Sequence, residues 1–93
     1  MIHAPSRLQI CCSLAGVDTM DFATLRQIAQ VSESVLSKHV KLLEEAGYVE
    51  VSKRTSLSRQ RTWLSLTRPG RAALAAHLAA LRDLIAAAEA SPP

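Results

Sequence analysis

The stretch VSESVLSKHVKLLEEAGYVE, residues 31–50, decides the fold, because it joins a helical pattern to a strand pattern at a single glycine. Leu36, Val40 and Leu43 recur at spacings of four and three residues, which predicts the buried stripe of an amphipathic helix. Gly47 then stands where a helix favours a left-handed residue at its C-terminus. The polar residues opposite the stripe are predicted to face outward: Ser34, Ser37, Lys38 and Lys41.

A shorter helix is predicted directly before this one, over residues 23–30. The apolar residues that repeat there at helical spacing are Leu25, Ile28 and Ala29. Ser32 is the predicted N-cap of the helix over residues 32–46. A helix–turn–helix with so short a turn sets its second helix across the first and leaves one face free.

An apolar-periodic run near the start predicts a first helix over residues 6–15, with Ser6 as its N-cap and Gly16 at its end. Its apolar positions are Leu8, Ile10, Cys11 and Leu14. Residues 17–22 are too few for more than a loop and a short β-bridge.

Two strands are predicted over residues 48–66. Val49 and Val51 alternate with polar neighbours in the first strand. The second strand alternates Thr62, Leu64 and Leu66 with Arg61, Trp63 and Ser65. Residues 55–58 are polar and turn-prone, so the strands form a hairpin with a basic tip. We expect Trp63 to pack under the hairpin or against a partner rather than to stack on nucleic-acid bases.

A last helix is predicted over residues 67–90, with Thr67 as its cap and Pro69 tolerated in its first turn. Apolar residues recur along it at alternating spacings of four and three, a heptad-like seam: Leu74, Leu78, Leu81, Ile85 and Ala88. This seam exposes more apolar surface than so small a core can cover. We therefore expect two copies to pack across a two-fold axis; the alternative is a helix that packs only on its own domain.

The chain is predicted to be one domain over residues 1–93, mainly α with a small β-hairpin, an α+β protein of order α-α-α-β-β-α. Aromatic residues make up only 3% of the chain, so the core must be built from Leu, Val, Ile and Ala. The net charge of +3 is mild, but residues 51–71 hold six basic residues and no acidic one. These cations indicate a polyanionic partner: Lys53, Arg54, Arg59, Arg61, Arg68 and Arg71.

Other classes of function are disfavoured. No apolar run approaches the ~20 residues of a membrane span, and the N-terminus lacks the pattern of a secretory signal, so we expect a cytoplasmic protein. Cys11 and Cys12 fit no zinc spacing and, as neighbours on a helix, are poorly placed to pair. No catalytic constellation is visible, and the three glycines are isolated terminators or turn residues. We expect no enzyme activity, no cofactor and no metal.

The free face of the helix over residues 32–46 suits the major groove of DNA, which is ~12 Å wide and admits one helix. The candidate groove contacts are Ser34, Ser37, Lys38, His39 and Lys41. The candidate contacts of the basic hairpin, to the minor groove or its phosphates, are Lys53, Arg54, Arg59 and Arg61. The alternatives are solvated lysines, arginines that serve solubility, and a packing role for His39.

The segment LSKHVKLLEEAGYV, residues 36–49, resembles the recognition-helix signature of the MarR and ArsR winged helix–turn–helix repressors. The ordered set SRLQI, DFATLRQIA, LSKHVKLLEEAGYVEVSK, RTWLSLT and GRAALAAHLAAL resembles the short stand-alone winged-helix regulators of the MarR-like group, over roughly residues 4–85. The resemblance implies a homodimer with DNA contacts at the residues named above. Its implied interface, from the first and last helices, comprises Leu8, Leu74, Leu78, Leu81 and Ile85.

The chain departs from the longer MarR proteins by lacking their extra C-terminal helix, and from ArsR sensors by lacking the paired-cysteine metal motif. A ligand pocket and metal sensing are therefore not carried over. A small-molecule effector at the dimer cleft, oxidation of Cys12 and no effector at all are the alternatives for regulation. Cys11 is expected in the core.

The function expected from the sequence is a transcriptional regulator of double-stranded DNA, most simply a repressor. Its two-fold symmetry would require a pseudo-palindromic operator with half-sites ~34 Å apart. The alternative is a winged-helix module that binds protein, which would show an apolar or acidic third helix rather than one of Ser and Lys. An RNA-binding module would show stacking aromatics at the hairpin tip, which has none.

Overall fold

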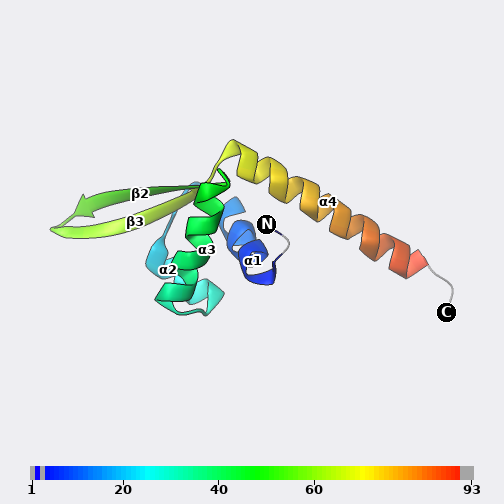
Figure 1. Ribbon diagram of the computed structural model, residues 1–93, viewed down its shortest axis with the longest axis horizontal. Coiled ribbons are helices and arrows are strands. Elements are labelled where there is room, and N and C mark those ends of the chain that lie inside the picture. The colour runs from blue at the N-terminus through cyan, green and yellow to red at the C-terminus, as the bar shows by residue number, and fades with distance from the viewer. Residues whose placement is uncertain (1, 3, 91–93) are drawn as a thin grey trace.

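Four helices and a three-stranded sheet make up the computed structural model, which describes residue 2 and residues 4–90 (Figure 1). The helices are α1 (Pro5–Ala15), α2 (Phe22–Ala29), α3 (Glu33–Glu45) and α4 (Arg68–Ala90). The strands are β1 (Met20–Asp21), β2 (Val49–Ser56) and β3 (Arg59–Leu66), in the antiparallel order β1-β3-β2. The predicted α+β winged helix–turn–helix is confirmed, including the short strand before α2.

Local hydrogen bonds explain where α2 and α3 begin, and a proline marks the start of α1. The Ser32 hydroxyl accepts from the Val35 amide (3.2 Å), so the predicted cap of α3 is confirmed. The predicted Ser6 cap of α1 is wrong: Ala4 is the N-cap, without a side-chain bond. Pro5 then occupies the first turn, where the missing N–H costs nothing.

The helix α2 begins at Phe22, one residue earlier than predicted, because Asp21 caps it. The Asp21 carboxylate accepts from both the amide and the hydroxyl of Thr24. The hydroxyl bond is the main reason that the pKa of Asp21 lies below its usual value. The helix ends at Gln30, whose left-handed φ of 54° turns the chain into α3.

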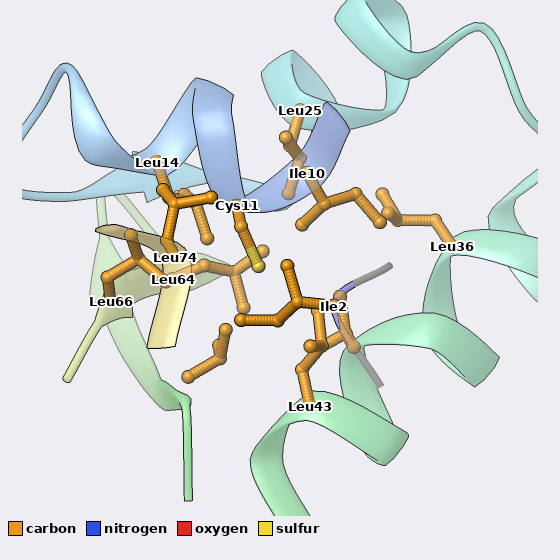
Figure 2. Close-up of a cluster of buried hydrophobic side chains, with 12 residues drawn as sticks. Ile2, Ile10, Cys11, Leu14, Leu25, Leu36, Leu43, Leu64, Leu66 and Leu74 are labelled. Carbon is orange, nitrogen blue, oxygen red and sulfur yellow. The ribbon is translucent and has the colours of Figure 1, made fainter. Parts of the chain in front are cut away.

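The core is a cluster of apolar side chains from every helix and from the hairpin (Figure 2). The predicted stripe of α3 is confirmed, since Leu36 and Leu43 are fully buried and Val40 is 7% exposed. Ile2, which sequence periodicity did not select, also lies in the cluster. Cys11 lies in the core as expected, and burial raises the pKa of its thiol to about 11, whereas Cys12 is exposed.

The end of α3 and the start of α4 are joined through backbone and hydroxyl groups. The Thr67 amide donates to the Tyr48 carbonyl (3.0 Å), and the Thr67 hydroxyl donates to the Gly47 carbonyl (2.6 Å). The same hydroxyl accepts from the Gly70 amide (3.0 Å), so Thr67 caps α4 as predicted. Gly47 has the predicted left-handed φ, at 81°.

Gly70 is not the terminator or turn residue that the sequence suggested, because it lies inside the first turn of α4. A Cβ atom at this position would stand 2.1 Å from the Tyr48 carbonyl oxygen. Glycine therefore permits the close approach of α4 to the α3–β2 connection.

The hairpin turn is tighter than predicted. The strands pair as far as Ser56 and Arg59, so only Leu57 and Ser58 form the turn. Both have positive φ, 50° and 64°, the pattern of a type I′ turn. Its hand matches the twist of the strands, but each non-glycine residue in this conformation costs roughly 1–2 kcal/mol.

The helix α4 extends away from the body of the molecule on the side opposite the hairpin (Figure 1), and the molecule measures 61 × 25 × 20 Å. Arg71 anchors its beginning by donating to the carbonyls of Ala15 and Val17, both at 3.2 Å. Leu74 was predicted at a dimer interface, but it is 3% exposed within one chain. It belongs to the core and has little surface to offer a partner.

We predict that Gly70→Ala lowers the free energy of unfolding by about 1–3 kcal/mol or more, since the new methyl group overlaps backbone that cannot move aside. Thermal unfolding measures the change, at about 4–8 °C per kcal/mol. The matched control is Gly16→Ala, where a Cβ would stand 4.0 Å from the Ser13 carbonyl oxygen and φ is −82°. Equal unfolding temperatures for the two variants would contradict this account of the junction.

Candidate nucleic-acid interface

The outward face of α3 carries the polar residues that the sequence predicted there. Ser34, Ser37, Lys38 and Lys41 are all exposed. They face outward because Leu36 and Leu43, on the other side of the helix, are fixed in the core. The helix also carries acidic residues, at its first turn and its last: Glu33, Glu44 and Glu45. Its middle is therefore the cationic, hydroxyl-bearing part.

His39 is separated from these residues. It is half-buried on the side of α3 that faces α1, where the Arg7 guanidinium donates to its Nδ1 at 3.4 Å. An arginine has no acceptor, so the ring nitrogen must accept and the imidazole must be neutral. Burial, followed by the charges of Arg7 and Lys38, lowers the pKa of His39.

The wing, formed by β2 and β3, has two different faces, and the predicted cations are divided between them. Side chains alternate along a strand, and residues paired across antiparallel strands point to the same face. Lys53 pairs with Thr62 and shares the face of the buried Leu64. Arg54 pairs with Arg61 on the opposite face.

The inner face of the wing meets α3. Lys53 lines a shallow hollow together with Ser37 and Lys41. Glu33 and Glu44 line the same hollow, so its charges are mixed. Helix and wing thus contribute cations and hydroxyl groups to one concave surface.

The outer face of the wing is more strongly basic. The Arg54 guanidinium carbon lies 5.5 Å from the centroid of the Trp63 ring, a cation–π contact. Arg54 and Trp63 line a second hollow, on this outer face, together with Arg59, Arg61 and Leu57 of the turn. Trp63 is half-buried on this face, and its role in packing rather than in base stacking stays a prediction.

Two further exposed residues, one on α3 and one on α2, were not selected from the sequence. Val35 is 42% exposed, one position before the buried Leu36. The sequence could have pointed to Val35, because an apolar residue of an amphipathic helix usually lies within the buried stripe and Val35 lies outside it. Arg26 of α2 lines a hollow with Arg59 and Arg61 of β3. Arg26 lies on α2, which directly follows β1, and the pairing of β1 with β3 brings this arginine near the two arginines of the wing.

Two other kinds of site are absent from residue 2 and residues 4–90. No three His, Cys, Asp or Glu side chains gather there in a way that could hold a metal ion. None of the helices in that part of the chain is both long and apolar enough to cross a membrane.

Known proteins share this arrangement of helices and hairpin. Residues 6–85 match a family model described as a winged helix DNA-binding domain. The chain belongs to this family. It is 33% identical over 67 residues to an uncharacterized protein of Methanocaldococcus jannaschii. That alignment covers 72% of this chain and 73% of the relative.

Solved structures share the fold. A transcriptional regulator homologue from Pyrococcus horikoshii OT3 superposes with a TM-score of 0.87 at 24% identity, covering 92% of this chain and 85% of that chain. A MarR family transcriptional regulator from Silicibacter pomeroyi DSS has a TM-score of 0.74 at 24% identity, covering 99% of this chain and 60% of that chain. The winged-helix fold that the resemblance to MarR-like proteins implied is thereby confirmed. Both structures bear the names of transcriptional regulators, not of enzymes.

We predict that acid destabilises the protein in part through His39. Its pKa is about 6.5 in the unfolded chain and lower in the folded protein, so the unfolded state binds more protons between the two values. The contribution of neutral His39 to the free energy of unfolding is therefore fully present above pH ~6.5, and it is lost as the pH falls toward the pKa of the folded protein. His39→Gln keeps an acceptor for Arg7 but cannot titrate. Thermal unfolding between about pH 7 and 5 should show a weaker pH dependence for this variant; a dependence identical to wild type would contradict the prediction.

Proposed function

We propose that the protein is a homodimeric, sequence-specific regulator of transcription in the cytoplasm, most simply a repressor. It binds double-stranded DNA by inserting α3 into the major groove while the wing contacts the neighbouring backbone and minor groove. The family supplies DNA as the partner class.

The observation that carries the proposal is the exposure of Ser34, Ser37, Lys38 and Lys41 on a helix whose other face is locked in the core. A fixed helix holds its hydrogen-bonding groups in register with base edges, which a loosely attached helix could not do. Lysine reaches guanine acceptors or phosphates, and serine contacts either kind of group. His39 lies on the α1 side, and we assign it to packing rather than to DNA.

Val35 adds an apolar contact to this set. It lies in the first turn of α3, close to the N-terminal part of a recognition helix that contacts base edges. The two exposed methyl groups of Val35 suit an apolar contact with the C5-methyl group of thymine, which only A·T pairs present in the major groove.

The wing supplies the sequence-independent part of the affinity. Lys53 lies beside α3, whereas Arg54, Arg59 and Arg61 line the outer face. Arginine and lysine side chains on phosphates release counterions, so this contribution weakens with salt.

The dimer is supported by the apolar surface of α4. Leu84 is 67% exposed and Ile85 is 55% exposed, in the half of the helix that extends beyond the body (Figure 1). Leu8, Leu78 and Leu81 are half-buried and are the other candidates for the partner's contacts. Leu84 replaces Leu74 in the interface that we propose, because Leu74 is already in the core.

We predict that the double variant Lys38→Ala, Lys41→Ala binds DNA about tenfold more weakly or worse. The probe is the duplex that the wild-type protein enriches most from a random pool, measured by fluorescence anisotropy at fixed salt. Thermal stability should hardly change, since both side chains are exposed. The matched control is Arg68→Ala, which removes an exposed cation beside the α3–α4 junction. Unchanged affinity of the double variant would remove α3 from the DNA interface.

We predict that Ile85→Glu converts a dimer into monomers in sedimentation velocity, because the new carboxylate would be buried without a partner in the interface. The fold should persist, since Ile85 is 55% exposed in one chain. Ala86→Glu introduces the same charge at the neighbouring exposed position, which points to another side of α4. A dimer that survives Ile85→Glu would place the interface elsewhere.

A further inference from the structure

The wing ends in an apolar side chain that nothing in the fold covers. Leu57 is 96% exposed, the most exposed of the large hydrophobic residues. It stands at the tip of the hairpin, which extends away from the helices (Figure 1). The fold therefore gains no core burial from this leucine.

The backbone at Leu57 disfavours leucine as well. Both turn residues have positive φ, a conformation that asparagine, aspartate and glycine adopt far more readily. A bulky side chain held in a sparsely populated conformation indicates a functional constraint. The two-residue turn also fixes the direction of the tip, because the strands on both sides are paired up to it.

The surroundings of Leu57 point to a polyanion. Arg54 and Arg59 lie within three residues of it, and both line the same hollow with Leu57. No acidic residue occurs between Glu50 and Asp83. An apolar tip framed by guanidinium groups matches the minor groove, where phosphates flank a narrow opening that leads to the base pairs.

We propose that Leu57 is an apolar wedge that inserts from the minor groove between two base pairs and bends the DNA. Arg54 and Arg59 bind the phosphates on either side and hold the wing in place. Insertion unstacks one base step and kinks the duplex toward the major groove. The inference rests on the proposed function, since it requires a wing that lies against DNA.

This wedge gives the protein a preference that α3 cannot provide. Pyrimidine–purine steps, TA and CA/TG, unstack most easily, so they are favoured where the wing tip lies. Leu57 makes no hydrogen bond to a base, and the preference comes from the deformability of the step. In a dimer, each wing would select one such step outside the half-site read by α3.

The test uses the most enriched duplex described above, with 2-aminopurine replacing adenine at one outer TA or CA/TG step at a time. We expect its fluorescence to rise at one step when the wild-type protein binds, because the base loses its stacking neighbour. Energy transfer between labelled DNA ends should report a bend of roughly 20–90°. Leu57→Asn, which suits the type I′ turn, should bind with neither signal.

Two control variants separate the loss of the apolar side chain from any change in the conformation of the turn. Ser58→Gly relaxes the same turn but retains the leucine, so both signals should persist. Leu57→Met retains an apolar wedge and should restore the fluorescence rise. Leu57→Asn should also keep the wild-type dependence of affinity on salt, since it removes no charge.

Wild-type binding without a fluorescence rise, or an equal rise and bend with Leu57→Asn, would overturn the wedge and leave the regulator intact. Failure of the wild-type protein to bind any duplex would overturn the proposed function and the wedge with it. In that case capture of an acidic protein by the wing, abolished by Leu57→Asn, would identify the tip as a protein-binding surface instead.

Discussion

The burial of one side of α3 is the constraint on which the rest of the molecule depends. Leu36 and Leu43 are fully buried among side chains from α1, α2 and the sheet, so the helix can neither rotate nor slide without opening the core (Figure 2). Close packing of this kind transmits position accurately, because displacing a core leucine costs several contacts at once. The orientation of the serines and lysines on the opposite side follows from it.

The junction between α3 and α4 extends that constraint to the projecting helix. Thr67 binds the carbonyls of Gly47 and Tyr48, and Gly70 lets α4 approach them closely. Arg71 ties the same turn of α4 to the end of α1. If α4 forms the dimer, the spacing of the two recognition helices is fixed by these few contacts, and a change at the interface would reach the DNA surface through them.

Periodicity predicted much of this fold because its signals were local. The stripe of α3, the Ser32 cap, the left-handed Gly47 and the capping Thr67 each depend on residues a few positions apart. The features that sequence did not predict depend on distant residues: Gly70 against Tyr48, Ile2 in the core, and Leu74 buried by its own domain. Charge counting found the basic wing, but only the strand register separates Lys53 from the three arginines and brings Arg26 near them.

In the function that we propose, two copies of α3, fixed by their cores and related by a two-fold axis, read DNA sequence. The most direct measurement is a selection from random duplex DNA at near-physiological salt, read by sequencing. Enrichment of an inverted repeat with half-site centres about 10–10.5 base pairs apart, or a multiple of that spacing, is the predicted result. Retention of DNA without any enriched sequence, or no retention at all, would contradict it.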